Sequence, residues 1–280
     1  MTKAKVDLHL HSTCSDGRLT PTQLVELVGG RQLSVMALTD HDSTEGIVEA
    51  LEASLKFPDL SIIPGVELST DIPGNEIHML GYLINYNDNK FQSTLHKFRE
   101  GRIGRAQEMV SKLANLGLPV RWERVVELAD GAVGRPHIAQ AMVEMGYIKY
   151  PQEAFVKYLG REGLAYAERE KLTPADSIAL ITSVGGIPVL AHPREVKNVG
   201  QYIPELKEAG LVGIEVYCAG YSPKEVSQLE TLANREGLIP CGGSDYHALD
   251  TPGEYLPGDV GPSLDITNKL YAIAKQINLK

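Results

Sequence analysis

The chain has 280 residues, of which 43% are hydrophobic and 22% charged, a composition typical of a globular protein large enough for one α/β barrel or two smaller domains. Its formal net charge of −9 argues against a broad basic groove for long duplex nucleic acid, but a short phosphorylated ligand needs only a few cations. A strand-like run begins close to Met1, and no apolar stretch approaches the ~18 residues of a membrane span, so we expect a cytoplasmic protein with no membrane partner.

Seven short apolar runs are typical of buried β-strands. They cover residues 6–11, 35–39, 61–68, 77–84, 187–191, 213–217 and 239–242. Helix-like segments separate most of these runs, and this alternation predicts a parallel α/β sheet or barrel.

Three of the intervening helices begin with the same signature. Thr20, Thr173 and Ser222 each place a hydroxyl at the N-cap, directly before a proline at the first helical position. Glycines follow near the expected helix ends, at Gly29, Gly185 and Gly237. We expect these segments to be the helices of βα units.

The alternation stops in the middle of the chain, where helical periodicity dominates in residues 103–116, 138–145 and 152–159. We therefore predict two parts: residues 1–98 and 172–280 form the barrel, and residues 99–171 form a small, mostly helical insert over the mouth of the active site.

Histidines gather where the strand-like runs end, with acidic residues beside them. Because side chains alternate along a strand, Asp7, His9 and His11 share one face, and two imidazoles then stand close enough for a common metal ion. The later clusters also fall at strand ends, the face on which (β/α) barrels build active sites.

Each such residue also has an ordinary explanation. A single histidine such as His78 is commonly a core residue, Asp16 before Gly17 commonly forms a turn, and Asp40 commonly caps a helix. A structural explanation must account for every cluster separately, whereas one metal site accounts for all of them.

The motifs resemble those of the polymerase and histidinol phosphatase (PHP) phosphoesterases, in the family's order and along both flanking blocks. They are Asp7-x-His9-x-His11, Asp16-Gly17, Thr39-Asp40-His41-Asp42, Pro64-Gly65-Val66-Glu67, His78, Ala191-His192-Pro193 and Ser244-Asp245-x-His247. The resemblance implies an α/β fold, a distorted (β/α)7 barrel with three divalent metal ions.

The resemblance also implies which residues hold the ions. One metal is expected among His9, His11, Glu67 and Asp245; a second, bridged by Glu67, among Glu67, His78 and His192; the third among Asp16, His41 and His247. Asp7 and Asp40 are expected behind these ligands, where they orient imidazoles.

The ligand chemistry limits the metal. The three cysteines show no CxxC spacing, and nitrogen and oxygen ligands suit Mn²⁺, which we expect, or Fe²⁺ or Zn²⁺. Clustered divalent ions activate water, so we expect metal-bound hydroxide to attack phosphorus without a covalent enzyme intermediate.

Three further residues are candidates for substrate contact. Arg194 follows the ligand motif at His192 and Arg135 lies in the insert, and each has a planar guanidinium suited to phosphate. His137, in a turn-like stretch, is the candidate proton donor and substrate contact. Tyr217, Tyr221 and Tyr246 are either stacking faces for a base or packing residues.

The segment Gly134-Arg135-Pro136-His137 is similar to the PHP subfamily of 3',5'-nucleoside bisphosphate phosphatases and the 5'-to-3' exoribonuclease RNase AM. We therefore expect a small phosphorylated nucleotide or short RNA as substrate. Three alternatives stay open: a phosphatase of histidinol phosphate or another small molecule, an amidohydrolase-type metal hydrolase, and a non-enzymatic module that has kept the barrel.

Overall fold

The computed structural model describes residues 5–277 except 73–74, 130–131, 169–171, 250 and 252. Seven strands form one sheet in the order β1 to β7. They are β1 (Val6–Asp7), β2 (Val35–Leu38), β3 (Ser61–Ile72), β4 (Asn75–Tyr82), β5 (Ile187–Leu190), β6 (Gly213–Glu215) and β7 (Ile239–Cys241). Seven strands were predicted, and the sheet curls as expected for an α/β barrel.

The expectation of a parallel sheet is wrong at one strand, because β4 pairs antiparallel with both β3 and β5. Only two residues separate β3 from β4, far fewer than a parallel crossover requires. The hairpin sets Ser69 in β3 opposite His78, the fourth of the eight residues of β4. Because β4 runs antiparallel, His78 lies at the same edge of the sheet as the ends of the parallel strands.

The two outer strands are joined by the segments that follow them. The amide of Leu8 donates to the carbonyl of Gly242 (3.2 Å) and the amide of Asp245 to the carbonyl of His9 (2.9 Å). Leu10 and Tyr246 form a further parallel bridge. Although β1 is two residues long rather than the predicted six, this seam holds His9 beside Asp245.

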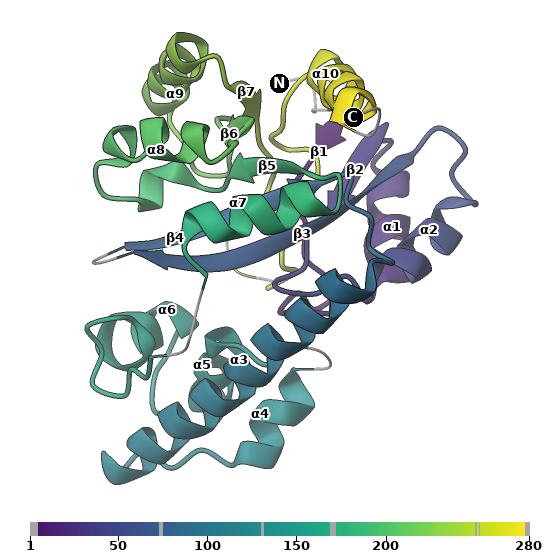
Figure 1. The fold of residues 1–280 in the computed structure, drawn as a ribbon. Coiled ribbons are helices and arrows are strands. Elements are labelled where there is room, and N and C mark those ends of the chain that lie inside the picture. The colour runs from purple at the N-terminus through teal and green to yellow at the C-terminus, as the bar shows by residue number, and fades with distance from the viewer. Residues whose placement is uncertain are drawn as a thin grey trace.

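Helices cover the sheet and form a separate group beside it (Figure 1). The barrel helices are α1 (Pro21–Gly30), α2 (Ile47–Ser54), α7 (Pro174–Ser183), α8 (Ile203–Glu208), α9 (Pro223–Glu236) and α10 (Leu264–Ile277). The separate group holds α3 (Asn89–Asn115), α4 (Trp122–Leu128), α5 (Arg135–Glu144), α6 (Pro151–Ala154) and a π-helical turn (Phe155–Leu159). Two 3₁₀ turns (Pro193–Glu195 and Val199–Gln201) follow β5.

The predicted helix starts are confirmed. Thr20, Thr173 and Ser222 are N-caps whose side chains accept from the backbone three residues on. Helix α1 ends at Gly30, one residue after Gly29, so its end also lies near the predicted glycine. Gly237 caps α9 with φ of 67°, a left-handed conformation that suits glycine.

The helical group has a core of its own, centred on Met109, Leu113, Ile138 and Met142. Helix α3 begins at Asn89 and so crosses the predicted boundary at residue 98, while the boundary at residue 171 lies outside the described residues. The division into barrel and insert stays a prediction, which the separate core supports. Across the described ranges, no helix is both long and apolar enough to cross a membrane.

Candidate metal centre

The nine predicted ligands come from both flanking blocks and lie together at one edge of the sheet. Ring centroids are 5.1 Å apart for His9 and His11, 4.1 Å for His11 and His247, and 4.9 Å for His78 and His192. The carboxyl ends of the parallel strands lie at this edge. Because β4 is antiparallel, its amino-terminal half lies there too.

Glu67, from the middle of β3, is the central carboxylate. One oxygen lies 2.9 Å from His78 Nδ1 and 3.0 Å from His192 Nε2, and the other lies 2.9 Å from His41 Nδ1. Burial raises the pKa of Glu67, but His41 and His78 outweigh it and hold the pKa well below its usual range. Glu67 is therefore an ionised group placed to bridge.

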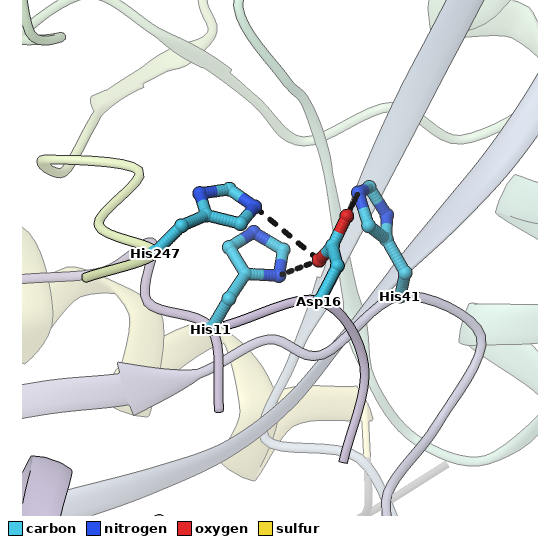
Figure 2. A group of neighbouring side chains, drawn as sticks. All are labelled: His11, Asp16, His41 and His247. Carbon is cyan, nitrogen blue, oxygen red and sulfur yellow. Dashed lines mark ion pairs between the residues drawn. The ribbon is translucent and has the colours of Figure 1, made fainter. Parts of the chain in front are cut away.

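A second group surrounds Asp16. Figure 2 shows its carboxylate between the rings of His11, His41 and His247, with the nearest nitrogens 3.7, 3.7 and 3.3 Å away. These separations exceed ordinary charge-assisted hydrogen bonds. They leave room for an ion shared by the four side chains.

Buried atoms that make no hydrogen bond test whether the residues fit metal ions. Within the described part of the chain, five imidazole nitrogens and one Asp16 oxygen are buried and make no hydrogen bond; the nitrogens are His9 Nε2, His11 Nε2, His41 Nδ1, His78 Nε2 and His192 Nδ1. Buried polar atoms normally have a partner, so such a set points to one that lies outside the polypeptide. Nitrogen and carboxylate donors fit divalent transition metals.

Donor atoms fall into three sets whose members lie within 4.8 Å of one another. The sets are His11, Asp16, His41 and His247; His9, His11 and Glu67; and His41, Glu67 and His78. His192 joins through Glu67, and Asp245 lies 3.3 Å from His9 Nε2 and 3.1 Å from His11 Nε2. Which ion each residue holds stays a prediction.

Backbone conformation at the centre is unusual. His192 and Asp245 have φ of 26° and 53°, and Asp42, beside His41, has φ of 49°. Residues other than glycine rarely adopt positive φ, and such strain gathers at functional sites. The turns after β2, β5 and β7 thus aim their ligands inward.

Glu215, the last residue of β6, is a functional residue that the sequence reasoning missed. Its Oε1 lies 3.0 Å from His9 Nδ1, and its Oε2 accepts from the His192 amide at 2.7 Å. It is 1% exposed. The signal was an acidic residue inside the apolar run 213–217, which had been read only as a strand.

Asp7 and Asp40 support the centre in different ways. Asp7 accepts from the backbone amides of His9, Ser244 and Gly258 at 3.0–3.3 Å, so it fixes the seam rather than orienting an imidazole as expected. Asp40 accepts from Ser15 Oγ at 2.6 Å, and that hydroxyl lies 3.4 Å from His11 Nδ1. Asp40 therefore reaches an imidazole through a serine.

Arginines gather beside the Asp16 group. A cavity of about 200 Å³ is lined by Asp16, His41, Ser69, Glu76, His78, Arg102, Arg105, Arg135, Pro136, Phe155 and His247. Arg135 lies at the start of α5, where Nη2 pairs with Glu76 at 3.0 Å and the guanidinium stands 5.7 Å from the Phe155 ring centre. Sequence reasoning missed Arg102 and Arg105, whose spacing of three puts them on one face of α3.

His137 lies in the first turn of α5 rather than in a turn-like stretch. Its Nδ1 accepts from the Gly134 amide at 3.0 Å, so the ring's own proton sits on Nε2. Burial and the charge of Arg102 lower the pKa of His137, although Asp16 opposes them. With Nδ1 accepting from Gly134, a neutral ring offers one N–H donor, at Nε2.

Arg194 lies on the other side of the centre, beside Tyr221. Its Nη1 donates to the Gly220 carbonyl at 2.9 Å, and the guanidinium stands 4.7 Å from the Tyr221 ring centre. Tyr217 donates to Glu230 at 2.9 Å and Tyr246 is buried, so both pack within the protein. Tyr221 lines a pocket beside the metal ligands and Arg194.

Known proteins resemble this chain along nearly its whole length. A 5'-3' exoribonuclease of Haemophilus influenzae is 34% identical over 98% of both chains. A 3',5'-nucleoside bisphosphate phosphatase of Chromobacterium violaceum is 31% identical over 98% of this chain and 95% of the relative.

A solved structure from Bifidobacterium adolescentis, assigned to the metal-dependent phosphoesterases, has a TM-score of 0.88 and 28% identity over 98% of this chain and 97% of its own. The sequence pattern of the PHP domain matches residues 7–147. These similarities agree with the curled seven-stranded sheet and with the cluster of histidines and carboxylates. The chain belongs to the PHP domain family of phosphoester hydrolases.

Proposed function

We propose that this hydrolase acts on 5'-phosphorylated nucleotides: it removes the 3'-phosphate of 3',5'-nucleoside bisphosphates and trims short 5'-phosphorylated RNA from its 5' end. The observation that carries the proposal is the cavity shared by three arginines and four predicted metal ligands. The named activities of the two curated relatives support both substrates.

The arginine cavity is suited to the phosphate that is not cleaved. Arg102 and Arg105 are 5% and 4% exposed, and Arg135 lines the same cavity. Guanidinium groups bind phosphate oxygens in pairs, and their attraction is strong where water is largely excluded. A nucleotide anchored there by its 5'-phosphate presents its 3' ester to the ligand cluster.

The nine predicted ligands would hold the reacting phosphate through the metal ions that they bind. Three divalent ions, with Mn²⁺ as the proposed species, would supply an activated water and neutralise charge on phosphorus oxygens. Glu215 and Asp40 keep His9 and His11 oriented, and the seam keeps Asp245 beside them. His137 stays the candidate substrate contact and proton donor, with Nε2 as the nitrogen that carries the ring proton.

A metal-supplemented assay tests the proposal. Purified, Mn²⁺-loaded protein should release phosphate from adenosine 3',5'-bisphosphate and mononucleotides from 5'-phosphorylated oligoribonucleotides. Arg135→Ala should lower kcat/KM for adenosine 3',5'-bisphosphate about tenfold or more, with a smaller effect on adenosine 3'-monophosphate, which lacks the anchored phosphate.

Histidinol phosphate and a simple lactone serve as competing substrates. Faster hydrolysis of histidinol phosphate than of the bisphosphate would favour the small-molecule phosphatase, and lactone hydrolysis alone would favour the amidohydrolase type. His9→Ala with full activity would show that the cluster is structural.

A further inference from the structure

Two adjoining pockets lie across the metal centre from the arginine cavity. The first, of about 300 Å³, is lined by the ligands His192, Asp245 and His247 and by Arg194, Tyr221 and Tyr255. The second, of about 690 Å³, lies between the 3₁₀ turns after β5 and helix α9, and includes Arg194, Asn198, Gln201, Gln228 and Leu229. Arg194 lines both pockets, so they adjoin at its side chain, and we refer to the two pockets together as the groove.

From this arrangement we infer that the groove binds the nucleotide on the 3' side of the scissile phosphate, and that Arg194 binds the next phosphate along the chain. The inference rests on the proposed function, because it needs the 5'-phosphate of the first nucleotide in the arginine cavity. With that phosphate on one side of His247 and the scissile phosphate at the ligand cluster, the rest of the RNA must leave on the other side. His247 lines both the arginine cavity and the first pocket.

The chemistry of the groove fits one nucleotide. Tyr221 and Tyr255 offer aromatic faces on which a base of any sequence can stack, and the pocket volumes lie within the range usual for small ligands. Arg194 is 46% exposed at its side chain, and its contact with Tyr221 holds the guanidinium at the junction of the two pockets. Its bond to the Gly220 carbonyl uses Nη1, and the guanidinium carries further donors for a phosphate.

The positive charge of the groove limits how many phosphates of the RNA it can bind. Among the described residues that line the two pockets, Arg194 is the sole lysine or arginine. Among the described residues, five carboxylates line the pockets, and each has a partner in the protein. Glu215 and Asp245 contact predicted ligands, Glu195 lies 3.4 Å from His192 Nδ1, and Glu254 accepts from the Leu249 amide at 2.9 Å. Glu225 accepts from Ser222 in the cap of α9 and lies 3.7 Å from Arg194 Nη1, a pair that a phosphate must compete with. The groove therefore recognises a single downstream phosphate, and rate should stop rising once the substrate supplies it.

Hydrolysis in this arrangement cleaves the phosphodiester between the first and the second nucleotide. Water adds to phosphorus, the bond from phosphorus to O3' breaks, and O3' takes a proton, so the first nucleotide leaves with a 3'-hydroxyl. The phosphate stays on the 5' oxygen of the downstream nucleotide. That product carries the 5'-phosphate that the arginine cavity recognises, and the next cycle can begin from it.

Three substrates test the groove on the Mn²⁺-loaded enzyme: adenosine 3',5'-bisphosphate, a 5'-phosphorylated diadenosine with a free 3' end, and the corresponding triadenosine. Only the triadenosine supplies a phosphate beyond the downstream nucleoside. Arg194→Met should lower kcat/KM for the triadenosine about tenfold more than for the diadenosine. Wild-type kcat/KM should rise from the di- to the triadenosine, and a fourth substrate, the corresponding pentaadenosine, should give no further rise.

Gln228, an exposed residue of α9 that lines the groove, provides a matched charge pair. At low ionic strength Gln228→Glu should lower and Gln228→Lys should raise kcat/KM for the triadenosine, each by two- to fivefold, with the bisphosphate changed less than 1.5-fold. Equal losses on all three substrates for Arg194→Met, or no effect of either Gln228 variant, would overturn the inference. Failure of the wild-type enzyme on all three substrates would instead overturn the proposed function.

Discussion

Glu215 is the residue that links two predicted metal ligands, which follow different strands. One oxygen faces His9 Nδ1, and the other accepts from the backbone of His192. A carboxylate behind an imidazole fixes the ring and raises the basicity of the nitrogen that faces the metal. Two predicted ligands therefore depend on one buried side chain.

Replacement of this carboxylate should weaken metal binding. Glu215→Gln is expected to lower Mn²⁺ affinity about tenfold or more, because the amide keeps the shape but loses the charge behind His9. Titration calorimetry on chelator-treated protein measures this directly. Glu208→Gln, at an exposed position on α8, should bind Mn²⁺ as the wild type does; equal affinities for all three proteins would refute the positioning role.

His137 predicts a pH dependence of stability. Its pKa in the folded protein lies below the usual 6.5, whereas the unfolded chain titrates near that value, so acidification favours unfolding. The stability that the neutral ring contributes is complete above about pH 6.5 and is lost as pH falls through the folded-state pKa.

His137→Asn should remove that contribution while its Oδ1 still accepts from Gly134. The slope of unfolding free energy against pH below 6.5 should become shallower, by up to about 1.4 kcal/mol per pH unit. Urea unfolding from pH 5 to 8 provides the measurement. An unchanged slope would mean that His137 does not titrate differently on folding.

At the scale of elements, α3 is fastened to the loop that carries His41. Arg102 Nε donates to Asp42 at 2.6 Å and Nη2 donates to Ser69 at 2.8 Å, with both ionic groups buried. Asp42 in turn accepts from the Ser69 amide at 3.3 Å, which joins β3 to the same network. The helical group and the metal centre therefore share one buried ion pair.

Breaking that pair should cost stability. Arg102→Met leaves the buried Asp42 carboxylate without its guanidinium and should lower the unfolding free energy by about 3 kcal/mol or more. Arg99→Met, whose pair with Glu45 is partly exposed, should cost about 1 kcal/mol or less. Denaturant titrations measure both losses of stability. Similar losses in the two variants would contradict a special contribution of the buried Arg102–Asp42 pair.

For the molecule as a whole, the seam between β1 and β7 determines whether the ligands meet. A Cβ at Gly243 would overlap the backbone nitrogen of His9 and the Asp7 carboxylate. Gly243→Ala should therefore lower the unfolding free energy by about 1–3 kcal/mol and weaken Mn²⁺ binding. Gly101→Ala, in the interior of α3 where no atom lies near the added Cβ, should raise the unfolding free energy by about 0.5–1 kcal/mol. Equal losses of stability in the two variants would contradict a specific role of Gly243 in the seam.

Metal loading should stabilise the whole fold. The ligands come from segments spread between His9 and His247, so ions that bind only the folded chain shift its equilibrium by mass action, by about 2.7 kcal/mol at one hundred times Kd. Calorimetry should show Tm rising with Mn²⁺ and falling again with a chelator. A Tm that changes neither with Mn²⁺ nor with the chelator would indicate that these residues hold no metal.

Sequence alone was enough to locate the seven strands and the helix caps, because periodicity and capping are local properties of the chain. The nine candidate ligands came from the resemblance of its motifs to the PHP family. Tertiary structure decided what depends on distant segments: the antiparallel β4, the seam that sets Asp245 beside His9, and the roles of Glu215, Arg102 and Arg105. An acidic residue in a strand or an arginine on a helix has no distinctive local pattern. Its function comes from the buried partners that folding brings to it.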